Sequence, residues 1–120
     1  MDIDAMSILR EAGVDTEGAL VRLMNNQAFY LKMLGKFQQD TNFAKLRSLI
    51  EAGEGQAAGE CAHALKGMCA TLGLTELSDL CAKLQYIYLG REEGDPAPVF
   101  ALAEESYAKA MDAMRRALAG

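Results

Sequence analysis

The chain has 120 residues, 51% of them hydrophobic, which predicts one domain with a hydrophobic core over residues 1–120. Its formal net charge of −5 and its 12 scattered basic residues argue against sequence-independent nucleic-acid binding, which needs clustered lysine and arginine. No stretch approaches the roughly 20 apolar residues that span a bilayer. The start Met-Asp-Ile-Asp lacks the pattern of a signal peptide, so we expect a cytoplasmic protein with no membrane contact.

Two short helices are predicted first. Apolar spacing indicates a helix from about Asp4 to Ala12 that ends at Gly13, where glycine tolerates the backbone of a helix terminus. Asp15 is a suitable N-cap for a second helix from Thr16 to about Met24.

A helical pattern then continues from Asn26 to Gly53. The segment Asp40-Thr41-Asn42 offers a place to break it, and the pattern leaves open whether one long helix or two form. The next predicted helix runs from about Gln56 to Leu72 and stops at Gly73, which can adopt a left-handed conformation.

Two further amphipathic helices complete the pattern. One opens at Leu74 or Thr75 and keeps helical spacing up to Gly90, and the last begins with Asp95 as N-cap and Pro96 as first helical residue. Short connections between amphipathic helices favour antiparallel neighbours. We therefore expect an all-α fold: an antiparallel up-down-up-down four-helix bundle with one or two short additional N-terminal helices.

The sulfur-containing residues are interpreted as core residues. Cys61, Cys69 and Cys81 have no Cys-x-x-Cys spacing and fall on apolar helix faces, so we expect reduced, buried thiols. No metal site is expected, because Cys61 and Cys69 point away from the only histidine, and metal ligands must converge. Four methionines are interpreted as adaptable core fillers: Met24, Met33, Met111 and Met114.

The only histidine, His63, lies on the polar side of its predicted helix. At about 100° per residue, the apolar side chains cluster within roughly 60° of Leu65, and His63 lies about 160° from that centre. The buried stripe consists of Ala58, Cys61, Ala62, Leu65, Met68, Cys69 and Leu72. His63 is therefore predicted to face away from the core.

Two neighbours of His63 indicate that an anionic group binds beside it. Lys66 and Gly67 follow it by three and four residues, the positions whose side chains lie nearest on a helix surface. Glycine inside a helix costs about 1 kcal/mol relative to alanine, which suggests that another molecule approaches the backbone closely. A neutral imidazole can accept a phosphoryl group, and a nearby ammonium group would offset the added charge.

The run His63-Ala64-Leu65-Lys66-Gly67, followed by Gly73, resembles the H-x-L-K-G-x-x-x-x-x-G motif of histidine-containing phosphotransfer (HPt) domains of multistep phosphorelays. Flanking apolar patterns extend the resemblance to roughly Gln27 to Leu89. The resemblance implies that His63 is the phosphoacceptor, that Lys66 supports the phosphoryl group and that Gly67 keeps the face open. At Gln85 many members have glutamate; in members with glutamine, that side chain can lie near the histidine, so the resemblance gives Gln85 a supporting role.

The resemblance also implies the partners. These are receiver domains of response regulators or hybrid sensor histidine kinases, whose aspartate and bound magnesium ion supply the chemistry, so the chain needs no cofactor of its own. Because no P-loop or other nucleotide-binding pattern is present, autophosphorylation from ATP is not expected and the chain is not classed as an enzyme. A monomer is expected. The predicted docking surface consists of Gln56, Gly59, Glu60, Ala70 and Ser78.

Two other functions fit less of the sequence. A phosphate-independent helical adaptor that binds or sequesters a receiver or kinase would not need His63, Lys66 and Gly67 together. A hydrolytic or isomerising enzyme with His63 as base would need an orienting carboxylate, for which only Glu60 is available, and a concave pocket.

Overall fold

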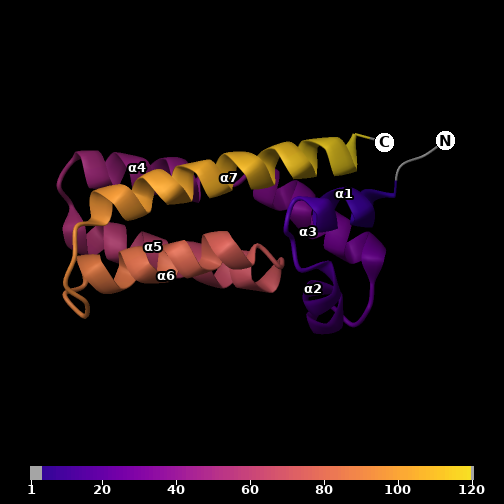
Figure 1. Ribbon diagram of the computed structural model, residues 1–120, viewed down its shortest axis with the longest axis horizontal. Helices are drawn as coiled ribbons and strands as arrows, with labels where there is room; N and C mark the ends of the chain where they lie inside the picture. Colours follow the sequence, from indigo (N-terminus) through magenta and orange to yellow (C-terminus); the bar gives the residue numbers. More distant parts are fainter. Residues whose placement is uncertain (1–3, 120) are drawn as a thin grey trace.

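The computed structural model describes residues 4–119, and these form seven α-helices and no strand (Figure 1). The expected all-α class is confirmed, and two short helices do precede the others. The helices are α1 (Ala5–Glu11), α2 (Thr16–Arg22), α3 (Gln27–Gln38), α4 (Asn42–Glu51), α5 (Gly55–Thr71), α6 (Thr75–Tyr88) and α7 (Pro96–Leu118).

The segment around Asp40 breaks the pattern into two helices, α3 and α4. Its carboxylate accepts hydrogen bonds from the backbone N–H of Asn42 at 2.8 Å and from the Asn42 side chain at 3.1 Å. The first bond satisfies a backbone N–H that has no partner inside the first turn of α4. Both bonds therefore favour the start of a new helix over continuation of α3.

Helices α5 and α6 pack as an antiparallel pair. The Ser78 hydroxyl, near the start of α6, donates a hydrogen bond to the carbonyl of Lys66 in the second half of α5 (3.0 Å). At the other end, Gly59 lies against Leu89, the residue just after α6. A three-residue connection between them leaves no other orientation for helices in contact along their length.

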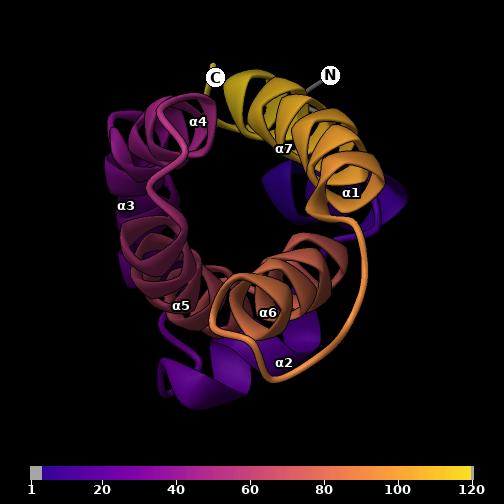
Figure 2. The ribbon, with the colours of Figure 1, turned by 90° about the vertical axis from the view of Figure 1, so that its left-hand side faces the viewer.

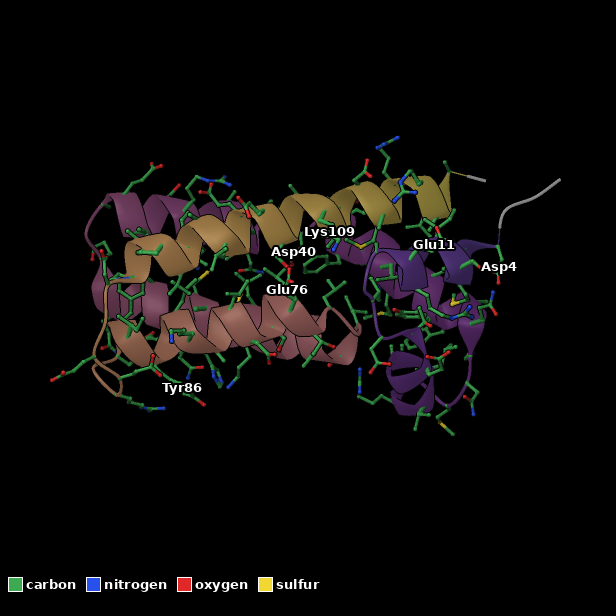
Figure 3. All side chains as sticks on the ribbon, in the orientation of Figure 1. Asp4, Glu11, Asp40, Glu76, Tyr86 and Lys109 are labelled. Atoms are coloured by element: carbon green, nitrogen blue, oxygen red, sulfur yellow. The ribbon has the colours of Figure 1, made fainter. Side chains whose placement is uncertain are left out.

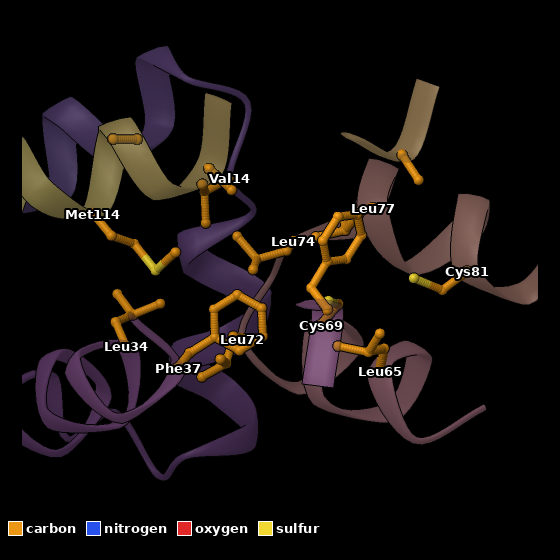
Figure 4. Packing of buried hydrophobic residues seen from close by; sticks show 14 of the residues in the cluster. Val14, Leu34, Phe37, Leu65, Cys69, Leu72, Leu74, Leu77, Cys81 and Met114 are labelled. Carbon is orange, nitrogen blue, oxygen red and sulfur yellow. The ribbon is translucent and has the colours of Figure 1, made fainter. Parts of the chain in front are cut away.

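Aromatic side chains join α7 to the pair of consecutive helices α3 and α4, here called the α3–α4 arm. The ring of Phe43 stacks on that of Tyr107, with centroids 4.1 Å apart, and on Phe100 at 5.6 Å, while Phe37 meets Tyr107 edge to face. Figure 2 shows the α3–α4 arm, α5, α6 and α7 arranged around one axis. Aliphatic and thiol side chains from these helices fill the space between them (Figure 4).

Helix α2 ends in an unusual way. Met24 has a φ of 58°, in the left-handed region where a glycine follows α1, α4, α5 and α6. The Asn25 amide donates to the Leu20 carbonyl (2.7 Å), which completes the terminal loop despite the methionine side chain. Met24 is 89% exposed, so its interpretation as a core filler is wrong, whereas Met114 is fully buried.

The N-terminal segment holds the C-terminal end of α5. The Tyr30 hydroxyl donates to the Leu72 carbonyl (2.7 Å), and the Arg22 guanidinium donates to the Ala70 and Thr71 carbonyls (2.6 and 3.3 Å). The last carbonyls of a helix have no partner within it, and a cation there also interacts favourably with the helix dipole. These bonds fix the end of the helix that carries His63.

Candidate functional site

His63 lies on the exposed face of α5, as helical phase predicted. Ala58, Ala62, Leu65 and Cys69 on the opposite face are at most 1% exposed. The predicted stripe is confirmed except at Met68, which is only partly buried. The imidazole is therefore open to a partner while its helix is anchored by the core.

A shallow hollow surrounds the imidazole. It is lined by Glu60 and His63 from α5, by Gln85 from α6, and by Leu89 and Arg91 just after α6. The structure thus brings Gln85 to His63, as the sequence resemblance implied. Leu89 and Arg91 were missed, because residues 91–94 read only as a polar connection and helical periodicity cannot place a residue beyond a helix end.

Gln85, which lines this hollow, has a side-chain oxygen without a hydrogen-bond partner. The residue is only 5% exposed, and its Oε1 is shielded from solvent without a hydrogen-bond partner. A buried polar atom without a partner costs about 1–3 kcal/mol, so one that persists calls for an explanation. The unpaired oxygen can accept a hydrogen bond, for example from a ring N–H.

Lys66 follows His63 by almost one helical turn and is half-buried. Its Nζ lies 6.0 Å from the centroid of the Tyr86 ring. Tyr86 extends outward from α6 (Figure 3) and is 38% exposed. The aromatic face attracts the ammonium group weakly, so Lys66 is held beside the open face while Nζ stays free to bind an anion.

Gly67 is open in the way the sequence predicted. A Cβ placed on it would meet nothing within 4 Å, so the absence of a side chain is not required by packing inside this chain. Gly67 also borders a second, largely apolar hollow between α3 and α5. Its other lining residues are Met33, Lys36, Phe37, Asp40, Met68, Thr71 and Leu72.

The sequence model of the Hpt domain family matches residues 32–119, which include the histidine motif and all of α4 to α7. This chain belongs to the Hpt domain family. Its members are histidine phosphotransfer modules of phosphorelays, without a kinase site of their own, and receiver domains of response regulators are their partners. A search of curated proteins and a search of solved structures found no match.

The Hpt match extends further toward the C-terminus than the resemblance seen in the sequence, because it includes α7. It leaves out α1, α2 and the start of α3. The bonds from Arg22 and Tyr30 to the end of α5 thus come from a part of the chain that lies outside the family match.

Two predicted docking residues of this Hpt domain are not on its surface. Gly59 is buried, and a Cβ there would come within 2.7 Å of the Leu89 side chain, so the glycine permits close packing of α5 on the end of α6. Ser78 is 7% exposed, and its hydroxyl is bonded to the Lys66 carbonyl. The expectation that Gly59 and Ser78 are exposed is wrong. Helical phase gives the face of a helix on which a residue lies, but not whether a neighbouring helix covers that face.

The other docking candidates are exposed. Gln56, Glu60 and Ala70 lie on the same side of α5 as His63. The Gln56 side chain donates to the Glu60 carboxylate at 3.1 Å, which fixes the acid beside the hollow. The exposed surface next to the histidine is therefore made by α5 itself, flanked by Gln85 and the chain just after α6.

The cysteines of this Hpt domain are buried and free, as expected. Burial raises the pKa of the Cys81 thiol to about 12 and raises that of Cys69 as well, so neither forms a thiolate nucleophile at neutral pH. Across residues 4–119, no three His, Cys, Asp or Glu side chains gather where they could hold a metal ion. Over the same residues, no helix combines the length and apolarity needed to cross a membrane.

Proposed function

We propose that this Hpt domain is a phosphorelay intermediate in which His63 accepts a phosphoryl group from one receiver-domain aspartate and passes it to another. The observation that carries this proposal is the setting of His63. The imidazole is exposed on a helix whose two cysteines are buried, in a hollow that Gln85, with an unpaired side-chain oxygen, also lines.

The chemical step needs only a positioned nucleophile on this chain. A ring nitrogen of His63 forms a bond to phosphorus as the bond from phosphorus to the aspartate oxygen breaks, which regenerates the carboxylate. The proton displaced from the imidazole goes to solvent. The receiver supplies the magnesium ion, and transfer to the second receiver is the reverse reaction. Phosphoryl transfer depends mainly on alignment and charge neutralisation.

Lys66 and Gln85 provide part of that neutralisation in this proposal. The ammonium group of Lys66 lies almost one turn from His63 and is steadied by the Tyr86 ring. The Gln85 amide can donate to a phosphoryl oxygen in the hollow that it shares with His63. Charge-assisted bonds from an ammonium group are the stronger of the two.

The proposed receiver-docking surface comprises Gln56, Glu60, Gly67 and Ala70. The apolar hollow beside Gly67 continues this surface toward α3. Small residues around His63 leave room for the receiver to close over the imidazole, with apolar contacts bordered by polar ones, as in other protein interfaces.

The scaffold in this proposal is an antiparallel up-down-up-down four-helix bundle that works as a monomer, supported by the two antiparallel pairings of α5 with α6 and of the α3–α4 arm with α7. Three free cysteines suit a reducing compartment such as the cytoplasm. Phosphate arrives from another protein, because the sequence contains no P-loop pattern for ATP.

The proposal is tested by incubating the chain with a phosphorylated receiver domain. We expect an acid-labile, base-stable phosphoprotein, and no label on a His63→Gln variant. Label on that variant would overturn the assignment of His63. If the wild-type chain binds receivers without taking label, and the variant binds equally well, the chain is a phosphate-independent adaptor instead.

A Lys66→Ala variant tests the role of the ammonium group. It is expected to fold normally, because Lys66 lies off the buried stripe, and to accept phosphate more slowly. Unfolding of this variant would show that Lys66 supports the fold, and an unchanged rate would remove it from the phosphoryl-binding site.

A further inference from the structure

Arg91 is held at the His63 hollow by the end of α6. The backbone N–H of Arg91 donates to the Tyr86 carbonyl (2.8 Å), and that of Gly90 donates to the Ile87 carbonyl (3.1 Å). Gly90 has a φ of 73°, which the two-bond terminal loop requires and glycine adopts without steric cost. The backbone of Arg91 is thus fixed by α6 although the residue lies in a connection.

The guanidinium of Arg91 has no carboxylate partner among the described residues. The ion pairs found in residues 4–119 involve other basic side chains, including Lys83 with Glu92, the residue next to Arg91. Glu60, the acid that lines the hollow, accepts a hydrogen bond from Gln56. Arg91 therefore lines the hollow without an ion-pair partner, together with Gln85, whose side-chain oxygen has no hydrogen-bond partner.

The position of Arg91 complements that of Lys66. Glu60 precedes His63 by three residues and Lys66 follows it by three, so the two lie on opposite sides of His63 along α5. Arg91 lines the hollow together with Glu60, whereas Lys66 lies toward Tyr86. A phosphoryl group on His63 would thus have one cation on each side.

We propose that Arg91 binds the phosphoryl group of phosphorylated His63 through its guanidinium, from the side of the histidine opposite Lys66. A guanidinium presents several N–H donors in a planar fork that matches phosphoryl oxygens, which an ammonium group cannot do. This inference rests on His63 being the phosphoacceptor.

A chemical donor tests the inference without a receiver. With phosphoramidate, a ring nitrogen of His63 forms a bond to phosphorus while the bond from phosphorus to ammonia breaks; ammonia leaves and the imidazole proton goes to solvent. Phosphorus NMR then follows the last ionisation of the phosphoryl group as pH changes. A cation in contact with the group favours its dianion and lowers its pKa.

Removing the cation should reverse that shift. Arg91→Ala is expected to raise the phosphoryl pKa by about three-quarters of a unit, the size expected for a unit charge about 4 Å away in a water-exposed site. Arg91→Lys should retain part of the effect. Arg115→Ala, which removes the same formal charge from the exposed end of α7, is the control and should leave the value unchanged. Circular dichroism establishes that each variant is folded.

The outcomes separate this inference from the proposed function. If the wild-type chain takes no phosphate on His63, the proposed function fails. If His63 is phosphorylated but Arg91→Ala has the same phosphoryl pKa as the wild-type chain, or Arg115→Ala shifts it equally, only the assignment of Arg91 is overturned.

Discussion

The middle of α5 and its C-terminal end differ in how the same helix meets its surroundings. Around Gly67 the outer face is bare, and a Cβ would meet nothing within 4 Å. At Gly73 the chain is tightly enclosed, with the Gly73 carbonyl accepting a hydrogen bond from the Asp15 amide at 2.9 Å. One glycine of the motif is next to open space, and the other is packed against backbone.

The difference indicates what each glycine contributes. Packing inside the chain does not require glycine at position 67, which leaves helix propensity or contact with another molecule as what a side chain there would change. A residue that could not be larger is restricted by the fold. The same helix is therefore held at its end by the N-terminal segment and accessible in the middle, where His63 is exposed.

The largest expected effect follows from filling the packed position. Gly73 has a φ of 80°, and a Cβ there would collide with the Asp15 carbonyl oxygen. Gly73→Ala combines backbone strain with a steric clash that only main-chain movement can relieve, so it should lower the free energy of unfolding by about 3 kcal/mol. Urea denaturation followed by circular dichroism measures the change.

Gly53→Ala is the matched control. Gly53 also follows a helix in the left-handed region, with a φ of 73°, but a Cβ on it would meet nothing within 4 Å. Strain alone predicts a loss of about 1 kcal/mol. Equal losses for the two variants would show that contact with Asp15 does not distinguish Gly73.

A smaller effect is expected from the hydroxyl of Tyr30, which bonds the Leu72 carbonyl at the same end of α5. Tyr30→Phe leaves that buried carbonyl with one partner fewer and should lower the free energy of unfolding by about 1–2 kcal/mol. Phosphorylation of His63 should persist, because Tyr30 lies at the far end of the helix from the hollow. An unchanged free energy of unfolding in the Tyr30→Phe variant would mean that water replaces the bond.

The same side chain predicts a pH dependence. Burial raises the pKa of Tyr30 to about 12, against an ordinary value of 10.0 in the unfolded chain. The folded state retains the proton that the unfolded state loses, so stability is fully present below pH 10 and falls as pH rises toward 12. Tyr30→Phe should show a shallower fall across that range, measured by denaturation at a series of pH values. Equal slopes would assign the alkaline loss to other groups.

Sequence reasoning succeeded where a single helix determines the answer. Helical phase placed His63 outside and Cys69 inside, and the chemistry of helix termini predicted Asp15 as a cap and Gly73 as a stop. These features depend on spacing and on local backbone preference, both of which are readable from neighbouring residues.

Sequence reasoning failed where contact with a second helix or connection determines whether a residue is exposed. Gly59 and Ser78 are on the expected sides of their helices but are covered by the partner helix, and Met24 closes a helix end that glycine closes elsewhere. Arg91 reaches the hollow only because the end of α6 directs it there. Interhelical register and the paths of connections depend on tertiary packing, which a single-helix pattern does not contain.

The smallest effect on stability, and the sharpest contrast, is expected at Gly67. Gly67→Ala gains helix propensity without meeting any atom of the chain, so it should raise the free energy of unfolding by about 0.5–1 kcal/mol. If a receiver must approach the backbone here, the same methyl group should slow phosphoryl transfer from a phosphorylated receiver while leaving reaction with phosphoramidate almost unchanged, because the small donor needs no such approach.

Gly35→Ala provides the control for this last variant. Gly35 lies inside α3, and a Cβ on it would also meet nothing within 4 Å, so the gain in stability should be similar. Because Gly35 lines neither hollow, its substitution should leave transfer from the receiver unchanged. If Gly67→Ala accepts phosphate from a receiver as fast as Gly35→Ala does, the open middle of α5 is not where the receiver makes its close approach, and the contrast with the packed end at Gly73 is one of stability alone.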